Sequence, residues 1–286
     1  MSTEAVHVEI DPSAGFCFGV AEAVRKAEEA LKETGSLYCV GQLLHNAHEI
    51  SRLEVMGLRT ISREELPEMT GCSVLFRAHG EPPGSYEMSR LSGARLVDAT
   101  CPVVKKLQER VKKSHDRGET IIIYGKPGHP EVAGIVGQVN GDAIVADRPE
   151  TLSPETLPEN LTLYSQTTMP AEGLRKLARW LEQHGKEVKL HNTVCRRVSG
   201  RVREVEQFAR KKDVILFVGG KNSSNSRHLF NISRRVNPRT HFIEDPGEVQ
   251  PKWFRSGDQV GVTGGTSTPV WLLEEIAGAV SETFTG

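Results

Sequence analysis

The fold is decided by residues 6–46, VHVEIDPSAGFCFGVAEAVRKAEEALKETGSLYCVGQLLHN. A strand-like segment is followed by Cys17, and apolar residues then recur at helical spacing as far as Leu31. A second strand-like segment begins at Ser36 and ends in a polar turn with His45. Apolar residues three or four positions apart predict an amphipathic helix, whereas short apolar runs bounded by turn residues predict strands. The stretch therefore predicts a strand, a helix that opens at Cys17, and a second strand.

The same unit occurs twice more in the chain. Strand-like segments at 94–99 and 186–191 precede Cys101 and Cys195, and each cysteine again opens an amphipathic pattern. In all three copies a polar turn lies 28 residues after the cysteine, and a third strand with its own polar turn follows. The turn residues are His45 and His79, then His129 and Thr167, then Ser223 and Ser267. Equal spacings can arise by chance, but in each copy the equivalent positions carry a histidine, threonine or serine that could bind a ligand.

Strands that alternate with helices predict parallel sheets with right-handed crossovers. We therefore predict an α/β protein of three small units in a pseudo-threefold arrangement. The expected units are residues 1–97 with Cys17, 98–185 with Cys101, and 186–286 with Cys195. Because ligands gather beyond the carboxyl ends of parallel strands, the cysteines and polar turns are expected to face one central cavity.

The charge balance and the cysteine count exclude several classes of protein. Lysine and arginine number 36 against 37 acidic residues, so no global field favours nucleic acid or an anionic membrane. No apolar run approaches the roughly 18 residues of a spanning helix, and the first residues have no signal-peptide pattern. We expect a cytoplasmic protein. Five widely spaced cysteines without a C-x-x-C pair argue against a disulfide framework, a zinc ribbon or a thioredoxin-type site.

The three helix-opening cysteines are candidate metal ligands. A cysteine at a helix start lies near unpaired N–H groups, which favour the thiolate that binds iron. We interpret Cys17, Cys101 and Cys195 as ligands of one iron–sulfur cluster, with zinc bound by three thiolates and a histidine as the alternative. A cubane held by three cysteines leaves one iron open for substrate. Cys39 and Cys72 are predicted to be small buried apolar residues.

The polar turns suit a small anion such as phosphate, because they offer many hydrogen-bond donors and little bulk. The set comprises His45, His79, His129, Thr167, Ser223, Ser224, Asn225 and Ser267. Glu131 is interpreted as the only carboxylate in these turns, and therefore as the proton donor for a departing hydroxyl group. His48 and His115 are predicted to be surface residues. No nucleotide-binding fingerprint is present, since GGKNSS does not match the P-loop pattern.

Motifs along the whole chain resemble the family of 4-hydroxy-3-methylbut-2-enyl diphosphate reductases of the non-mevalonate isoprenoid pathway. They are GFCFGV at 15–20, HN at 45–46, AHG at 78–80, DATCP at 98–102, GHPE at 128–131, SQTT at 165–168, KNSSNS at 221–226 and GGTS at 264–267. One departure is the CRRVSGRV stretch after Cys195: Arg201 is kept, but Val198 replaces a threonine, and Ser199 is the neighbouring hydroxyl.

The resemblance implies a reductive dehydroxylation at a [4Fe-4S] cluster on Cys17, Cys101 and Cys195, with isopentenyl and dimethylallyl diphosphate as products. The implied diphosphate ligands are His45, His79, Ser223, Ser224, Asn225 and Ser267. His129, Thr167 and Glu131 are implied to manage the hydroxyl group and protons. An electron donor such as a ferredoxin or flavodoxin is expected. Two alternatives are a related iron–sulfur reductase or dehydratase of another small anionic substrate and a non-catalytic iron–sulfur sensor.

Overall fold

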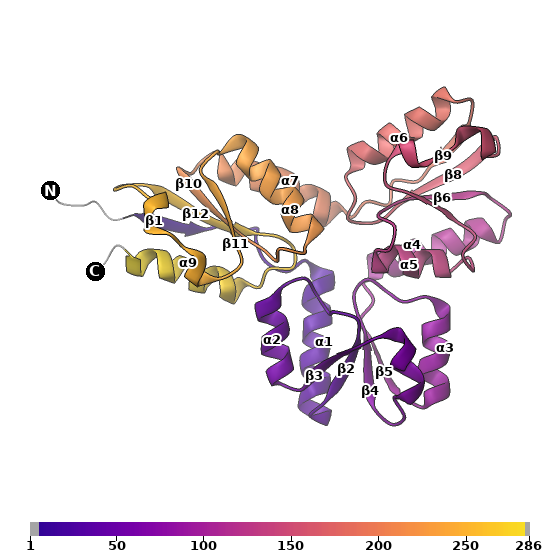
Figure 1. Ribbon diagram of the computed structural model, residues 1–286, viewed down its shortest axis with the longest axis horizontal. Helices are drawn as coiled ribbons and strands as arrows, with labels where there is room; N and C mark the ends of the chain where they lie inside the picture. The colour runs from indigo at the N-terminus through magenta and orange to yellow at the C-terminus, as the bar shows by residue number, and fades with distance from the viewer. Residues whose placement is uncertain (1–5, 284–286) are drawn as a thin grey trace. The chain divides into compact units, whose positions relative to one another are not determined.

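The computed structural model describes residues 6–283 and contains three four-stranded sheets (Figure 1). The strands are β1 (His7–Ile10), β2 (Leu37–Val40), β3 (Leu58–Ile61), β4 (Ser73–Phe76), β5 (Arg95–Asp98), β6 (Ile121–Tyr124), β7 (Ile144–Ala146), β8 (Asn160–Ser165), β9 (Glu187–Leu190), β10 (Val214–Val218), β11 (Thr240–Ile243) and β12 (Gln259–Gly264). The α-helices are α1 (Phe18–Thr34), α2 (Ala47–Val55), α3 (Pro83–Ser92), α4 (Pro102–His115), α5 (Pro130–Gly137), α6 (Ala171–Gln183), α7 (Arg196–Ala209), α8 (Ser224–Val236) and α9 (Val270–Thr283). Short 3-10 helices η1 (Arg63–Glu68), η2 (Pro149–Thr151), η3 (Pro154–Thr156), η4 (Pro246–Glu248) and η5 (Pro251–Trp253) complete the described elements.

All three sheets have the same connectivity. Their strand orders are β3-β2-β4-β5, β7-β6-β8-β9 and β11-β10-β12-β1, and every pair of neighbours is parallel. In each sheet the two central strands are separated in the chain by one edge strand, and in the sheet of β10 the other edge strand, β1, comes from the start of the chain. Connections between the strands are crossovers, as parallel pairing requires. The prediction of three parallel α/β units is confirmed. Their pseudo-threefold arrangement around a cavity stays a prediction.

Helices cover both faces of the sheet β7-β6-β8-β9. On one face, apolar side chains of β6 and β8 pack with Leu174, Leu177 and Leu181 of α6. On the other face, Leu107 and Val111 of α4 pack with β6 and α5. Figure 1 shows α6 on one side of this sheet and α4 with α5 on the other. Burial on both faces explains why the central strand β6 reads as an uninterrupted apolar run, IIIY.

The sheet β1-β12-β10-β11 is covered in the same way. Helix α9 packs its Leu272, Leu273 and Ile276 against one face, and α7 and α8 cover the other with Val205 and Leu229 among others. Figure 1 shows α9 on the opposite side of the sheet from α7 and α8. In the sheet β3-β2-β4-β5, Tyr86 of α3 meets Phe76 of β4 edge to face at 4.9 Å between ring centroids. Each sheet is therefore the centre of a small sandwich.

Each cysteine-led helix connects one sheet to the next along the chain. Helix α4 follows β5 but packs on the sheet of β6, and α7 follows β9 but packs on the sheet of β10. The sequence had suggested that the strand before each cysteine belongs with the elements after it. Instead, β1 pairs with β12, and β9 pairs with β8. The shift arises because the helix after each cysteine leads out of a sheet instead of returning to it. The expected unit boundaries remain a prediction.

The chain forms two compact units, which are described separately. The Cys17 unit comprises residues 6–21, 44–52 and 200–283, and it contains the sheet β1-β12-β10-β11. The Cys101–Cys195 unit comprises residues 22–43 and 53–199, with the other two sheets. Within residues 6–283, no helix has both the length and the apolar character needed to cross a bilayer.

Candidate functional site

The backbone of each candidate cysteine is hydrogen-bonded to a predicted site turn. The N–H of Cys101 donates to the carbonyl of Ala78 at 3.0 Å, next to His79. The N–H of Cys195 donates to the carbonyl of Thr167 at 2.8 Å. In the other unit, the N–H of Cys17 donates to the carbonyl of Thr266 at 3.0 Å. Every cysteine is thus fixed beside the polar turn of the neighbouring central strand of its own sheet.

A second feature shared by the three cysteine turns is an Asx turn, which sequence reasoning missed. The carboxylate of Asp11 accepts from the N–H of Ser13 at 2.9 Å, and that of Asp98 accepts from the N–H of Thr100 at 2.9 Å. The amide oxygen of Asn192 accepts from the N–H of Val194 at 3.3 Å. Side chains of this type close a turn on their own backbone two residues ahead. The signal in the sequence was an Asp or Asn at the end of each edge strand or just after it, namely Asp11, Asp98 and Asn192.

Cys101 and Cys195 lie close enough to interact electrostatically within their unit. Burial raises the pKa of the Cys101 thiol, and the charges of Cys195 and Glu131 raise it further. Backbone N–H groups of Val103 and Val104 oppose this shift, as expected at a helix start, but they do not overcome it. The helix start therefore favours the thiolate of Cys101 as expected, but burial has the larger effect on its pKa. Among residues 6–283 the structure groups no three His, Cys, Asp or Glu side chains in a way that could hold a metal ion. A bound metal would lower the pKa of a thiol by its own charge, so ligation by Cys101 stays a prediction.

Glu131 is the second residue of α5 and is 1% exposed. Its two carboxyl oxygens accept from Thr167, one from the backbone N–H at 2.6 Å and one from the hydroxyl at 2.8 Å. Burial raises the pKa of Glu131 to about 7, because the neutral donors of Thr167 compensate only part of the lost hydration. A carboxyl group with this pKa can both hold and release a proton near neutral pH.

His129 and His79 face each other within the same unit. Their ring centroids are 5.4 Å apart and the planes are nearly perpendicular, at 79°. His129 caps α5, and its Nδ1 accepts from the N–H of Glu131 at 3.1 Å. A neutral His129 therefore carries its proton on Nε2, where it is available for donation. The structure thus brings Glu131, Thr167, His129 and His79 together with the turns of two cysteines.

The sequence had suggested that Glu131 is the only carboxylate in the predicted turns, but the structure shows a second one. Glu81 follows His79 by two residues, as Glu131 follows His129, and it is also buried. Its environment differs because Arg63 donates to it at 2.7 Å and Ser85 at 3.2 Å. A guanidinium partner stabilises the ionised form. Glu81 therefore has a guanidinium partner, whereas Glu131 has only the neutral donors of Thr167.

In the Cys17 unit, Thr266 joins several predicted residues. Its hydroxyl accepts from Nδ2 of Asn225 at 3.1 Å, and its carbonyl accepts from Cys17. Ser267 is the next residue and is half-buried. Ser223 is buried and caps α8, where its Oγ accepts from the N–H of Ser226 at 3.2 Å, while Ser224 is exposed. Hydroxyl and amide groups thus surround the positive end of a 13-residue helix.

The turn of His45 belongs to this unit as well. A Cβ atom on Gly220 would lie only 2.2 Å from the carbonyl oxygen of His45, so a glycine is required where these two turns approach each other. This contact places the backbone of His45 against the loop that leads to Ser223. The structure therefore groups His45, Ser223, Asn225 and Ser267 in one unit, and His79, His129 and Thr167 in the other.

An ion pair that the sequence did not reveal fixes the Cys17 turn. Arg201 of α7 and Asp11 are 1% and 3% exposed, and their side chains are 2.6 Å apart. Arg201 also donates to Thr263 at 2.7 Å, and Asp11 accepts from Ser13 at 2.7 Å. Burial would raise the pKa of Asp11, but Arg201 and the hydroxyl donors outweigh it and lower the pKa. The pair joins the turn before Cys17 to the end of β12.

Replacing Arg201 with methionine is expected to lower the free energy of unfolding by about 3–5 kcal/mol at pH 7, because Asp11 is left buried without its cation. The folded pKa of Asp11 is lowered, so the stability that its pair with Arg201 provides is fully present above the unfolded pKa. That stability is lost as the pH falls from there through the folded pKa, where the two proteins should become more alike. Urea denaturation at several pH values measures both effects. Arg210→Met, which breaks an exposed pair with Glu206, is the control. Equal losses of unfolding free energy in both variants would contradict a stabilising role for the buried pair of Arg201 and Asp11.

The remaining sequence predictions concern residues away from these turns. Cys39 is buried as expected, and burial raises its pKa to about 12. Cys72 was expected to be buried but is only half-buried, because it precedes β4 in a turn. His48 and His115 are partly exposed, each 3.2 Å from an aspartate, Asp245 and Asp142 respectively. Ser199 is exposed, and its hydroxyl donates to the Arg196 carbonyl at 3.2 Å.

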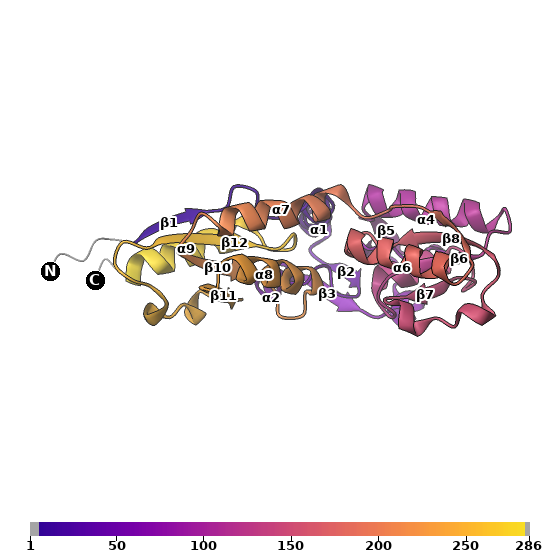
Figure 2. The same cartoon turned by 90° about the horizontal axis from the view of Figure 1, so that it is seen from above.

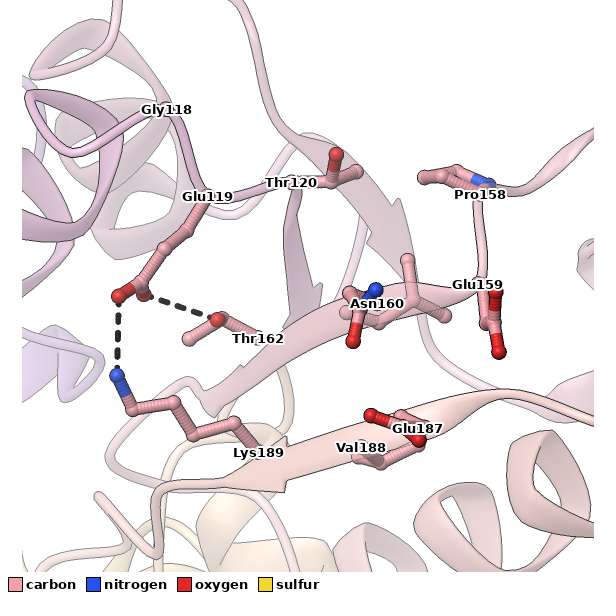
Figure 3. A pocket seen from close by; sticks show the side chains of 11 residues that line it. Gly118, Glu119, Thr120, Pro158, Glu159, Asn160, Thr162, Glu187, Val188 and Lys189 are labelled. Atoms are coloured by element: carbon pink, nitrogen blue, oxygen red, sulfur yellow. Dashed lines mark hydrogen bonds and ion pairs between the residues drawn. The ribbon is translucent and has the colours of Figure 1, made fainter.

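A pocket of about 640 Å³ lies at the opposite edge of the sheet β7-β6-β8-β9 (Figure 3). It is lined by residues 118–120, 158–162 and 187–189, which surround the amino ends of β6, β8 and β9. Figure 3 shows Glu119 bonded to Lys189 and Thr162, each at 2.9 Å. Glu119 and Lys189 in its lining pair with each other, and ligands of parallel sheets gather at the other edge. This pocket is therefore separate from the candidate site.

Comparisons with known proteins agree with this arrangement. The model of the LytB protein family matches residues 8–281. A 4-hydroxy-3-methylbut-2-enyl diphosphate reductase of Phocaeicola vulgatus is 40% identical, covering 96% of this chain and 98% of the relative. One of Chloroherpeton thalassium is 39% identical, covering 97% of both chains.

Two solved structures are also similar. One, of (E)-4-hydroxy-3-methyl-but-2-enyl diphosphate reductase, the terminal enzyme of the non-mevalonate pathway, has a TM-score of 0.76 and 38% identity over 97% of this chain and 99% of that one. The other, of E-1-hydroxy-2-methyl-but-2-enyl-4-diphosphate reductase from Plasmodium falciparum, has a TM-score of 0.82. At 23% identity over 96% of this chain and 87% of that one, it shows the shared fold.

Proposed function

We propose, from the premise that this chain belongs to the LytB protein family, that it reduces 4-hydroxy-3-methylbut-2-enyl diphosphate to isopentenyl and dimethylallyl diphosphate. Relatives of about 40% identity over nearly the whole chain carry that name. The structural observation that carries the proposal is the hydrogen bond between each cysteine and a polar turn at the end of a central strand. This pattern supports the proposal, because in each sheet a cysteine lies beside a polar turn.

Cys17, Cys101 and Cys195 are proposed to hold a [4Fe-4S] cluster. None of the three forms a disulfide, all are half-buried, and each precedes the first residue of a helix. The backbone N–H groups of Val103 and Val104 at the Cys101 sulfur are of the kind that tune cluster sulfurs. When bound, the cluster supplies electrons and an open iron that acts as a Lewis acid. Iron and zinc analysis of anaerobically purified protein separates this centre from the zinc alternative.

Glu131 is proposed to provide the proton for the departing hydroxyl group. The overall reaction breaks a C–O bond, forms a C–H bond and consumes two electrons and two protons, so that the oxygen leaves as water. Thr167 holds both oxygens of Glu131 and thereby fixes the carboxyl group, while Nε2 of His129 is a second donor. Burial keeps Glu131 protonated up to about pH 7. The proton is therefore present under physiological conditions.

The diphosphate is proposed to bind through His45, His79, Ser223, Ser224, Asn225 and Ser267. The start of α8 adds backbone N–H groups, which together with hydroxyl and amide donors suit phosphate oxygens. His129 and Thr167 are proposed both to bind the substrate and to assist protonation, whereas the other diphosphate ligands are proposed for binding alone.

Ser223→Ala and Asn225→Ala are expected to weaken binding of pyrophosphate by about 1–3 kcal/mol each, because a charged acceptor loses one donor. Cluster absorption spectra should stay unchanged. Inhibition constants for pyrophosphate measure the effect. Ser281→Ala, at the far end of α9, is the control, and its hydroxyl donates to the Ala277 carbonyl at 3.0 Å. Unchanged inhibition in both site variants would refute the anion site.

The decisive test of the function is turnover of 4-hydroxy-3-methylbut-2-enyl diphosphate by anaerobically purified protein with dithionite and methyl viologen. Mass spectrometry should detect both five-carbon diphosphates. If the protein carries a cluster but releases neither product, a reductase or dehydratase of another small anion or a cluster-based sensor would replace the proposal. A ferredoxin or flavodoxin is the proposed physiological donor. The cytoplasmic location expected from the sequence remains a prediction.

A further inference from the structure

Helix α4, which begins directly after Cys101, carries an exposed row of cations. Lys106, Arg110 and Lys113 are exposed and follow one another at spacings of four and three residues, so they share one face of the helix. Val103 begins the same row and is 44% exposed, although it is apolar. The opposite face, with Val104, Leu107 and Val111, is buried against the sheet. These four exposed residues are named the α4 row.

Some cations of other surface helices are paired within the helix, whereas others, such as Arg175 and Arg179 of α6, have no ion pair recorded among residues 6–283. In α1, α3 and α6 an arginine or lysine pairs with a glutamate of the same helix, as do Arg25 with Glu22 and Arg90 with Glu87. Within residues 6–283 the structure records no ion pair for Lys106, Arg110 or Lys113. The chain as a whole has a net charge of −1, so this positive face is a local feature.

Ordinary helix electrostatics do not explain the whole row. Cations near the last turn of a helix are stabilised by its dipole, which accounts for Lys113. Lys106 lies in the second turn, close to the positive end, where a cation gains nothing from the dipole. Glu109 is the only acidic residue of α4, and it lies beside the row and not within it. The charge pattern therefore calls for a negative partner from outside the helix.

We propose that the α4 row docks a small acidic electron-carrier protein of the ferredoxin class. This inference rests on the proposed function, which consumes two electrons per substrate that the carrier must deliver one at a time. In each encounter one reduced carrier cluster loses one electron to the enzyme, and two encounters complete one reduction. Charge complementarity selects the acidic partner, and Val103 supplies an apolar contact only two residues from the proposed cluster ligand Cys101.

The expected interface is small and depends on charge. Transient electron-transfer complexes bury little surface, and opposite charges mainly accelerate their association. Figure 2 shows α4 at the margin of the Cys101–Cys195 unit, over the sheet that contains β6 and β8. Its outer side is therefore accessible to a partner. Salt should weaken the complex, since the Debye length is about 10 Å at 0.1 M ionic strength.

The test uses the cluster-loaded enzyme with Lys106→Glu, Arg110→Glu and Lys113→Glu combined. Reduced plant-type [2Fe-2S] ferredoxin serves as donor at low salt, and reduced methyl viologen serves as the small-molecule donor. We expect kcat/KM for ferredoxin to fall about 10- to 100-fold and its salt dependence to disappear. The rate with methyl viologen should remain within twofold of wild type. Calorimetric titration with oxidised ferredoxin should show the same loss of affinity without turnover.

The control reverses three exposed cations on α6, Arg175→Glu, Lys176→Glu and Arg179→Glu, which change the net charge of the same unit equally. It should leave ferredoxin kinetics nearly unchanged. The proposal would be overturned by equal losses of kcat/KM for ferredoxin in both variants, or by normal ferredoxin affinity in the α4 variant. It would also be overturned if a DNA duplex or an anionic vesicle bound the enzyme while ferredoxin did not. If the glutamate variant does not fold, the corresponding glutamine variant replaces it under the same criteria. Loss of methyl viologen activity by wild-type enzyme would instead contradict the proposed function.

Discussion

Anaerobically purified Cys101→Ser protein is expected to lose most of its iron, whereas the wild-type protein should contain about four iron atoms per chain. Cys101 is held by its backbone against Ala78 and lies near Cys195, so serine keeps the position but removes the thiolate. A hydroxyl group is a poor ligand for cluster iron. Iron analysis and electron paramagnetic resonance of the reduced protein measure the loss. Cys17→Ser and Cys195→Ser should behave in the same way.

Cys72→Ser is the matched control for this prediction. Cys72 is half-buried like Cys101, and serine there changes the same atom, but no candidate turn contacts it. Cys39 is less suitable, because it is fully buried and a hydroxyl group at that position would need a new partner. If Cys101→Ser protein retained a full cluster, or if Cys72→Ser protein lost it as well, the assignment of the ligands would be refuted.

The helices and turns near the cysteines could be predicted because their signals are local. Apolar spacing after Cys17 and Cys101 gave helices that do begin at the next residue. Equal spacing to His45 and His129 reflects a helix and a strand of similar length in each copy. Short-range periodicity of this kind is determined by which face of an element is buried. Such periodicity can therefore be recognised in a single sequence.

Sheet membership could not be predicted in the same way. The strand at 186–191 was grouped with the residues that follow Cys195, yet β9 pairs with β8. Pairing depends on where a crossover helix packs, and an amphipathic helix carries no local signal for one sheet over another. The apolar stripe of α7 fits the sheet of β10 because that sheet supplies the matching face, with Phe217 among its residues.

The environment of the candidate site was only partly predictable. Glu131 was identified from its position in GHPE, but Glu81 holds the equivalent position and was overlooked. The two acids differ in their long-range partners, since Arg63 is 18 residues away from Glu81 in the chain and Thr167 is 36 residues away from Glu131. Such partners decide whether a buried carboxyl group is ionised. Only the folded chain shows them.

Glu131→Gln is expected to reduce kcat by roughly 10²–10⁴-fold at equal cluster content, which is the usual contribution of a positioned acid. Glutamine keeps the shape and can still accept from Thr167, but it has no acidic proton. In the wild-type enzyme the proposed donor is protonated only below a pKa of about 7, so kcat should fall as the pH rises through 7. Glu131→Gln should lose this dependence. Steady-state rates with saturating methyl viologen between pH 5.5 and about 8.5 measure both effects.

A purely structural role for Glu131 predicts a different result. The folded pKa of Glu131 lies above the value of 4.5 for an exposed glutamate, so the folded state binds the proton more tightly than the unfolded state does. Its ionisation must then destabilise the wild-type protein by about 3 kcal/mol as the pH rises from 4.5 to 7. Glu131→Gln removes this penalty, and its stability relative to wild type should increase over the same range. A variant with this stability gain but with kcat within a few-fold of wild type would remove Glu131 from the mechanism, because burial alone would then account for its pKa.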